Sequence, residues 1–571
     1  MSMTRARVFV LFFVPAITAG CSGASPGSAP DGGDDGSSGG VPDATTPERD
    51  ASGAPSDGSA ADAGSADGPI PMDAAEAGMG TTTVVDGGIP DDASTGDAST
   101  GDASTGDAST SDASTDATNA GDAITDGAAA DDTTLLDATP ETGTSGVTPS
   151  SATTLAAGTE FICAVVAGGG VNCWGRNDRG QLGVDESTGP QTCMTPDLPG
   201  GSQYGCSAVP VSVCATGTMS PCASFLTGAV AVAAGDDFVC AVVSGGAVDC
   251  WGDADQGQLG NGEPPYTVST LATPAPVCAP GGSAPCTSFL TGAVAVAAGY
   301  EFTCALMADG AVACWGANLN GQLGDGTVAS GIDDNIGSSS PVSVCAPGAS
   351  APCTQTLNAT AIAAGFDFAC AVVGSGGVQC WGGNDDGQLG VGAFADASAC
   401  GTTTCSPTPM TVKGVGGTAA LSGATAVAAG EGHACAIVSG GAVVCWGENT
   451  DGELGDGTTT NSSTPVAVCA VGASAPCTSY LTGVTAITAS DEFTCALLAD
   501  GTVACWGVAG VTYSATSVPV LVPSSPGGTT PLSDVVTIAS GAAFSCAVQA
   551  DQSVYCWGTN SNSGEFGNGS L

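Results

Sequence analysis

The sequence has very few basic residues. Among 571 residues, lysine and arginine together number 6 and histidine 1, against 56 aspartates and glutamates, so the formal net charge is −50 at pH 7. Proteins that bind nucleic acids need a basic surface, which displaces the counterions around phosphates. This composition excludes that class, and an anionic membrane surface would also repel the chain. A cation, or a partner with a basic patch, remains compatible with it.

The shortage of basic side chains also limits catalysis. From residue 151 onwards the basic residues are Arg176, Arg179 and Lys413, and the single histidine is His433. Serine triads and Cys–His dyads therefore lack partners, and a Gly-x-x-x-x-Gly-Lys phosphate loop is absent. Paired carboxylates such as Asp236–Asp237 are compatible with acid–base chemistry but are more typical of surface turns. We expect no catalytic residues and no enzymatic activity.

Long apolar runs are absent, and the only apolar segment of note lies at the N-terminus. Arg5 and Arg7 precede residues 8–18, which are too few to span a bilayer and are typical of a signal peptide. The run Thr18-Ala19-Gly20-Cys21 resembles a bacterial lipobox, although a larger apolar residue is usual at the first position. We expect a signal peptide over residues 1–20 and lipidation of Cys21. The alternative is an ordinary signal peptide followed by a chance cysteine.

This interpretation predicts an exported outer-membrane lipoprotein at the cell surface, which contacts the membrane only through its lipid anchor. Residues 21–150 consist mainly of Asp, Ala, Ser, Thr and Gly, with a five-residue period that begins at Asp92. Such a segment has too few apolar side chains to offset the entropy of ordering its backbone. We therefore expect residues 21–150 to be a disordered acidic tether and residues 151–571 to form the folded domain.

The folded domain is built from seven repeats. The tripeptide Cys-Trp-Gly occurs seven times and contains every tryptophan of the protein. A second cysteine lies ten residues before each of these cysteines. Two residues earlier there is an aromatic ring, which is Phe in six repeats and His433 in one. We interpret His433 as a core ring. Repetition of this kind indicates a solenoid or a propeller.

Each repeat has the pattern of a β-hairpin. In the third repeat, two runs rich in β-forming residues flank a three-residue turn, Ala308-Asp309-Gly310, which ends in the Gly that such turns require. This register places Cys304 directly opposite Cys314. Both faces of the hairpin are apolar, so each small sheet must pack between neighbours, as radially arranged blades do. A fourth strand is visible as a Pro-Val run, for example at Pro341.

The turn after each Trp-Gly carries a further motif. Gly-Gln-Leu-Gly or a close variant begins at Gly180, Gly257, Gly321, Gly387, Gly452 and Gly564. Together with the Ala-Ala-Gly that precedes five of the seven hairpins, this pattern resembles the regulator of chromosome condensation repeat from about Ala152 to the C-terminus. The resemblance implies an all-β fold, a seven-bladed β-propeller of four-stranded antiparallel blades. The sixth repeat lacks the motif after Trp506-Gly507, and we expect a different turn there.

The resemblance implies less about function than about fold. The family includes a nuclear exchange factor for a small GTPase and a secreted bacterial propeller that inhibits β-lactamases. Guanine-nucleotide exchange rests on this analogy alone, because the present chain has the signs of export and an acidic propeller. A shared fold does not imply a shared function.

The cysteine spacing predicts a disulfide framework and an oxidising compartment. Seven hairpin pairs are Cys163–Cys173, Cys240–Cys250, Cys304–Cys314, Cys370–Cys380, Cys435–Cys445, Cys495–Cys505 and Cys546–Cys556. Four pairs with a Cys-x7-Cys spacing are Cys214–Cys222, Cys278–Cys286, Cys345–Cys353 and Cys469–Cys477, and the remaining pairs are Cys193–Cys206 and Cys400–Cys405. Only Cys21 is left over, which agrees with its lipidation. Zinc knuckles are absent, so we expect no metal site.

Calcium is the one cofactor that the sequence leaves open, although we expect none. Asp253-Ala-Asp255-Gln-Gly257 and Asn384-Asp385-Asp386-Gly387 gather oxygen ligands in turns. No glutamate follows at the spacing of a helix–loop–helix calcium site. Turns stabilised by Asp and Asn side chains explain the same residues without a metal.

We expect recognition on one rim of the propeller. With the strands of a blade named a to d in chain order, antiparallel order places the b–c turns and the d–a loops on one rim. The a–b turns and c–d loops share the other. The c–d loops carry irregular insertions, whose candidate binding residues are Met194, Tyr204, Tyr266 and Phe394.

These features predict a monomeric cell-surface or secreted binding module for an unidentified protein or surface ligand. The alternative is a secreted propeller-type inhibitor of another enzyme, which would need a ring of exposed aromatic anchors on one face. Few aromatic residues remain once the Phe and Trp of the blades are set aside, and this favours the binding module.

Overall fold

The structure is a computed structural model, and it describes residues 152–185, 191–194, 203–218, 221–329, 337–393, 400, 404–508, 515–561 and 563–570. The predicted signal peptide, Cys21, the predicted tether and Phe394 lie outside the described residues, as does the side chain of Met194. The described residues form strands, turns and loops. Among them there is no helix with the length and apolar character needed to cross a membrane.

The strands form seven antiparallel sheets, which we number as blades 1 to 7 in chain order. Blade 1 contains β1 (Ala152–Ala157), β2 (Phe161–Val166), β3 (Gly170–Arg176), β4 (Gln191–Met194) and β5 (Gln203–Ser212). Blade 2 contains β6 (Ala229–Ala234), β7 (Phe238–Val243), β8 (Ala247–Asp253) and β9 (Thr270–Pro276). Blade 3 contains β10 (Ala293–Ala298), β11 (Phe302–Met307), β12 (Val312–Ala317) and β13 (Gly337–Ser343).

The second half of the chain continues the pattern. Blade 4 contains β14 (Ala359–Ala364), β15 (Phe368–Val373), β16 (Gly377–Gly383) and β17 (Cys405–Thr411). Blade 5 contains β18 (Ala424–Ala429), β19 (His433–Val438), β20 (Ala442–Gly447) and β21 (Ser462–Ala467). Blade 6 contains β22 (Val484–Ala489), β23 (Phe493–Leu498), β24 (Val503–Gly507) and β25 (Thr516–Leu521). Blade 7 contains β26 (Val535–Ser540), β27 (Phe544–Gln549) and β28 (Val554–Gly558).

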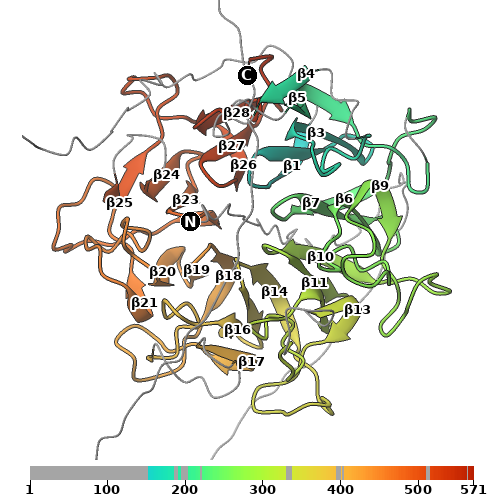
Figure 1. Cartoon of the computed structure of the whole chain (residues 1–571). Helices are drawn as coiled ribbons and strands as arrows, with labels where there is room; N and C mark the ends of the chain where they lie inside the picture. The colour runs from blue at the N-terminus through green and yellow to red at the C-terminus, as the bar shows by residue number, and fades with distance from the viewer. Residues whose placement is uncertain are drawn as a thin grey trace, which may run out of the picture. The chain divides into compact units, whose positions relative to one another are not determined.

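The blades are arranged around a central axis, as Figure 1 shows. The a strands lie nearest the axis and contact one another from blade to blade; β1, for example, contacts both β6 and β26. The d strands lie at the circumference. The predicted seven-bladed, all-β propeller of four-stranded blades is therefore confirmed. Two blades vary from the pattern: β4 adds a fifth strand to blade 1, and blade 7 has three described strands.

The hairpin register follows the sequence prediction. In blade 3, Cys304 pairs directly with Cys314, and the turn between β11 and β12 is closed by a hydrogen bond of 2.9 Å from the Gly310 N–H to the Met307 carbonyl. Gly310 has a φ of 88°. In the hairpins, the Cα atoms of the paired cysteines lie 4.0–4.1 Å apart and the sulfurs are joined by disulfides.

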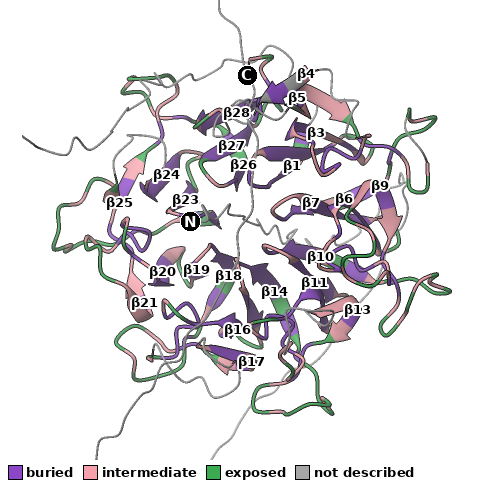
Figure 2. Ribbon diagram, viewed as in Figure 1, coloured by how far each residue is buried: buried purple, intermediate pink, exposed green. Residues whose placement is uncertain are grey.

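Most residues of the inner three strands are buried, as Figure 2 shows, whereas the second residue of strand a is exposed, for example Val230. Six of the seven tryptophans are almost fully buried between blades, and the hairpin Phe rings lie beside them. In six blades a glycine follows strand a, and it has a packing role, because a Cβ on Gly299 would lie 2.1 Å from the Phe302 ring and 2.5 Å from the Gly365 carbonyl of the next blade. Glycine allows this close approach without displacing either neighbour, and Ser490 replaces it in blade 6.

Hydrogen bonds from tryptophan link consecutive blades. The indole N–H of Trp251 in blade 2 donates to the carbonyl of Gln181, which belongs to the Gly-Gln-Leu-Gly turn of blade 1, at 3.0 Å. The same bond recurs at 2.7–2.9 Å in blades 3 to 6. Trp174 in blade 1 donates to the Glu565 carbonyl of blade 7 at 2.8 Å, which closes the ring. The motif that identifies the repeat is therefore an inter-blade contact.

Candidate binding faces

The two rims of the propeller differ in composition. In every blade the chain leaving strand c pairs with the a–b turn beside it: the Arg176 N–H donates to the Glu160 carbonyl, and the Asp253 N–H to the Asp237 carbonyl, each at 2.9 Å. We call this rim, formed by a–b turns and c–d loops, the loop face. On the opposite rim, the N–H of Ala229, the first residue after a d–a loop, donates to the Gly169 carbonyl of a b–c turn at 2.9 Å. We call it the hairpin face. The prediction that the a–b turns and c–d loops share one rim, and the b–c turns and d–a loops the other, is confirmed.

The loop face gathers carboxylates from the a–b turns. They are Glu160, Asp236, Asp237, Glu301, Asp367, Glu431, Asp491 and Glu492. Several of these side chains are partly buried between neighbouring blades, where water stabilises their charge poorly. Burial raises the pKa of Asp237 to about 6, and it raises the pKa of Glu301 and of Asp367 to about 7.

Two arginines of blade 1 balance part of this charge. The Arg176 guanidinium lies 2.6 Å from the Asp178 carboxylate and 3.6 Å from that of Glu160. The Arg179 guanidinium crosses to blade 2 and lies 3.3 Å from Asp253 and 3.6 Å from Asp255. Since the third basic residue of the propeller, Lys413, belongs to a d–a loop, the turns of blades 3 to 7 on the loop face contribute no basic side chain.

An aromatic pair lies in the middle of these acidic turns. Tyr300 and Phe366, from the a–b turns of blades 3 and 4, are stacked with ring centroids 4.3 Å apart and an interplanar angle of 25°. Both are half-buried. Burial, and then the charges of Asp236 and Glu301, raise the pKa of Tyr300. Tyr300 and Phe366 were not among the predicted binding residues, although no other repeat has an aromatic residue at that turn position.

The predicted binding residues are found in different environments. Tyr266, in the c–d loop of blade 2, is 55 % exposed and its hydroxyl accepts a 3.2 Å hydrogen bond from Gln256. Tyr204 was expected in an irregular loop, but it lies on β5, where its hydroxyl is 2.7 Å from Ser563 Oγ of blade 7. The Arg176 guanidinium lies 5.6 Å from the centre of its ring. Tyr204 is therefore half-buried in the joint between blades 1 and 7 and not a free anchor.

The turns considered for calcium carry other interactions. Asp253 and Asp255 form ion pairs with Arg179, and Asp385 accepts hydrogen bonds from the Thr404 backbone and hydroxyl. Among the described residues, no group of three or more His, Cys, Asp or Glu side chains is placed to hold a metal ion.

His433 is fully buried, and one ring nitrogen lies 2.8 Å from Thr494 Oγ1. Burial lowers its pKa to about 3. His433 is therefore a neutral core residue, which matches its interpretation from the sequence.

The hairpin face carries exposed aromatic residues that the sequence analysis did not consider. Phe225, Phe289 and Tyr480 are 54 %, 47 % and 54 % exposed. Each pairs across a d–a loop with the first cysteine of a Cys-x7-Cys segment, as Tyr480 does with Cys469. The signal was present in the sequence, since each aromatic residue lies three positions after the second cysteine. These loops are short and repetitive, which is why the predicted binding residues lie on the c–d loops instead.

Comparison with known proteins supports this architecture. Models described as the regulator of chromosome condensation (RCC1) repeat match residues 152–181, 229–258, 293–322, 359–388, 424–453 and 535–564, and also 246–306, 375–437 and 440–497. The protein is thus an RCC1-type β-propeller, and the chain belongs to the regulator of chromosome condensation repeat family.

Individual relatives are distant. The chain is 26 % identical to the ultraviolet-B receptor UVR8 of Arabidopsis thaliana over 432 residues, which are 74 % of this chain and 80 % of the receptor. It is 27 % identical to the human E3 ubiquitin-protein ligase HERC2 over 268 residues, which are 46 % of this chain but 5 % of the ligase. The crystal structure of human WBSCR16 superposes with a TM-score of 0.52 at 20 % identity, and the match covers 70 % of this chain and 92 % of that one. The last likeness concerns the fold alone.

Proposed function

We propose that this protein is an exported binding module that recognises a protein partner with a basic surface through its loop face. RCC1-type propellers are modules that bind or regulate other proteins. The observation that carries the proposal is the asymmetry of the ring: the loop face combines carboxylates from the a–b turns of six blades, the Tyr300–Phe366 pair and c–d loops of varied length. A rigid ring with variable loops on one rim is an arrangement typical of recognition surfaces.

The negative charge of the loop face indicates that the partner has a basic surface. An acidic face attracts basic proteins and accelerates their association, and this effect weakens as salt is added. Partly exposed aromatic rings such as Tyr266 and Phe366 can provide contact area at a small cost in side-chain entropy.

The experiment uses the immobilised propeller to capture proteins from culture fluid and cell surfaces, followed by affinity measurement for the retained partner. The variant Tyr266→Ala/Phe366→Ala removes two rings from the loop face, and Phe225→Ala/Phe289→Ala removes two rings from the hairpin face. We expect the first variant to weaken binding by about 2 kcal/mol while the second leaves it unchanged. Loss only in the second variant would move the binding site to the opposite rim.

We also propose that Cys21 carries a lipid and that residues 21–150 present the propeller at the cell surface. The lipobox-like sequence and the acidic, apolar-poor composition of that segment support this proposal. The variant Cys21→Ser should move the protein from the membrane fraction to the soluble fraction. Membrane fractionation that is unchanged in this variant contradicts the anchor.

A second candidate function is inhibition of another enzyme by occlusion of its active site. The Tyr300–Phe366 pair favours it, because these rings lie on the same face as the exposed Tyr266 and could serve as anchors. An enzyme captured by the propeller would distinguish the two functions, since an inhibitor abolishes its activity at saturation and a recognition module does not.

A further inference from the structure

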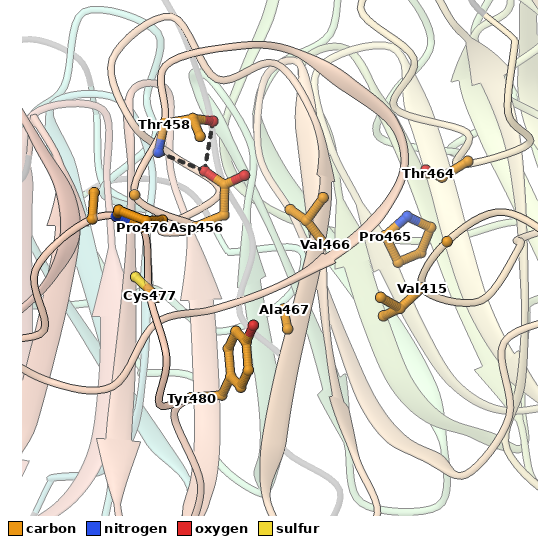
Figure 3. A pocket seen from close by; sticks show the side chains of 13 residues that line it. Val415, Asp456, Thr458, Thr464, Pro465, Val466, Ala467, Pro476, Cys477 and Tyr480 are labelled. Carbon is orange, nitrogen blue, oxygen red and sulfur yellow. Dashed lines mark hydrogen bonds between the residues drawn. The ribbon is translucent and has the colours of Figure 1, made fainter.

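A groove lies at the circumference of the propeller between blades 4 and 5, and no residue of an a–b turn lines it. Its volume is about 520 Å³. Figure 3 shows strand β21 along one side, with Pro465 and Val466, and Tyr480 at the base. In the same view the c–d turn around Asp456 lies at the other end from Tyr480, and Val415 of blade 4 lies beside Pro465.

The groove lies where the repeat pattern is broken. The d–a loops of blades 1, 2, 3 and 5 have the Cys-x7-Cys form. In blade 4 the loop has no cysteine and is shorter, with Lys413 pairing directly with Ala420. In blades 1 and 5 the long loop reaches the d strand of the next blade, since the Gly217 N–H donates to the Pro274 carbonyl at 3.2 Å and the Gly472 N–H to the Pro519 carbonyl at 2.9 Å.

Beside the short d–a loop of blade 4, apolar side chains of the groove are exposed to solvent. Val415 is 58 % exposed and Tyr480 is 54 % exposed. Together with Pro465 and Pro476, they give the groove walls that favour an alkyl chain over a hydrated polar group.

One carboxylate is available at the end of the groove. Asp456 Oδ1 accepts hydrogen bonds from the Thr458 N–H at 2.8 Å and from the Thr458 hydroxyl at 2.7 Å. These bonds hold the side chain in a fixed orientation. Within the described part of the chain, the other oxygen, Oδ2, makes no hydrogen bond. In Figure 3 it is turned away from Thr458, on the side of Val466.

We propose that this groove binds the side chain of a lysine or arginine in a basic segment of a partner protein. The alkyl part of that side chain packs against Tyr480, Val415 and Pro465, and its charged end pairs with Asp456 Oδ2. The Tyr480 ring adds an attraction for the cation. The groove takes Asp456 from a c–d loop, but its lining includes no a–b turn and none of Tyr266, Tyr300 and Phe366. Its test with Asp456 and Tyr480 variants is therefore separate from the test of the function proposed above.

The strong negative charge of the whole chain requires matched controls, because any basic peptide will be attracted to it. Asp325 in blade 3 occupies the same position in its own turn, with hydrogen bonds of 2.9 and 2.6 Å from the N–H and hydroxyl of Thr327. Thr356 replaces Tyr480 in that blade. Phe289 is the matched exposed ring in blade 2.

The experiment measures binding of three capped eight-residue peptides, in which Ala alternates with Lys, Arg or norleucine, to the full-length protein by isothermal titration calorimetry at 150 mM NaCl. We expect the Lys and Arg peptides to bind and the uncharged norleucine peptide to bind at least 10-fold more weakly. Asp456→Asn, which keeps the turn because Asn accepts the same hydrogen bonds, should weaken binding 3- to 10-fold, as should Tyr480→Ala. Asp325→Asn and Phe289→Ala should change binding by less than 2-fold.

Two outcomes would overturn the proposal. Equal losses in Asp456→Asn and Asp325→Asn would mean that the peptide responds only to net charge. No measurable binding of the Lys and Arg peptides, or binding unaffected by Asp456→Asn and Tyr480→Ala, would mean that the groove is not a site. Thermal melting of all four variants checks that the propeller remains folded.

Discussion

Glutamine in the Gly-Gln-Leu-Gly turn has two roles, one for its main-chain carbonyl and one for its side chain. The turns that carry glutamate in its place show which role depends on the side chain. The main-chain carbonyl accepts the hydrogen bond from tryptophan. The side chain closes the turn, since Gln181 Oε1 accepts the Arg179 N–H at 2.8 Å, and its amide donates to Asp237 of blade 2 at 3.0 Å. In blade 5 the residue is Glu453, whose Oε2 accepts the Asp451 N–H at 3.0 Å while Oε1 is buried without a partner. Burial raises the pKa of Glu453 to about 8. A protonated Glu453 is thus the closest equivalent of the glutamine in other blades.

This comparison predicts that Glu453→Gln stabilises the propeller at pH 8 and above. The glutamine amide is a hydrogen-bond donor at every pH and carries no charge that burial would penalise. We expect the free energy of unfolding to rise by roughly 1–3 kcal/mol at pH 9 and to change little at pH 5. Chemical denaturation at the two pH values measures it. The control, Glu263→Gln, makes the same substitution in a half-buried loop and should have no such pH-dependent effect. An equal response of the two variants contradicts the assignment.

Backbone conformation at the b–c turn gives a second prediction at the residue scale. Glycine occupies the last turn position in six blades, but in blade 7 it is Gln552, with a φ of 72°. A side chain in this left-handed region costs about 1 kcal/mol. Gln552→Gly should therefore raise the free energy of unfolding by about that amount, seen as a higher midpoint of denaturation. The reverse change at the matched turn of blade 6, Gly501→Gln, should lower it; if neither variant shifts the midpoint, the turn is not strained.

At the scale of the blade, the missing motif of the sixth repeat has a visible consequence. In six blades the indole N–H of the tryptophan donates to a carbonyl in the Gly-Gln-Leu-Gly turn of the preceding blade. Blade 7 is preceded by blade 6, which lacks this turn, and the indole N–H of its Trp557 has no partner among the described residues. Trp446 donates to the Gln388 carbonyl at 2.8 Å.

We expect Trp446→Phe to cost about 1 kcal/mol more than Trp557→Phe, because only the first substitution leaves a buried carbonyl without its donor. Urea denaturation of the two variants under the same conditions gives the difference. Equal losses would show that burial of the ring, and not the hydrogen bond, determines the contribution of the tryptophan.

The disulfides also belong to the scale of the blade. Each hairpin is bridged between directly opposed residues, and the d–a loops are bridged with Cα atoms 5.2–5.7 Å apart. The prediction is that, apart from Cys21, no cysteine reacts with a thiol reagent in the unfolded, non-reduced protein. Mass spectrometry after alkylation counts the labels, and more than one or two labels per chain would refute the pairing.

At the scale of the whole molecule, stability should depend on pH. The pKa is raised by burial to about 6 for Asp237, about 7 for Asp253, Glu301 and Asp367, and about 8 for Glu453 and Glu565. Between the ordinary values of 3.8 or 4.5 and these raised values, the folded state keeps protons that the unfolded state has released. The free energy of unfolding therefore falls as pH rises through this window.

We expect the melting temperature of the propeller to be higher at pH 5.5 than at pH 8.5. Thermal melts at constant ionic strength test this. The experiment is repeated with Asp551→Asn, a fully exposed residue on the hairpin face that should leave the dependence unchanged. A melting temperature that rises towards pH 8.5 contradicts the direction derived from the buried carboxylates.

Much of the architecture could be predicted from the sequence because it repeats. The seven Cys-Trp-Gly motifs define the blades, and the three-residue turn at Gly310 fixes the register that sets Cys304 opposite Cys314. Both follow from local rules: period-two alternation and the need for glycine in the left-handed region. The sign of the surface also follows from composition, since there are too few basic residues to neutralise the acids of the propeller.

The tertiary structure decided what depends on contacts between blades. Tyr204 had the sequence context of an exposed loop residue, yet β5 continues through it and packs it against Ser563, which lies 359 positions away. Tyr300 and Phe366 become a pair only because neighbouring a–b turns converge around the axis. The groove beside Tyr480 likewise exists because one short loop is adjacent to a longer one in the ring. Repetition determines each blade locally, but which side chains meet across a joint depends on the packing of residues far apart in the chain, which local patterns do not encode.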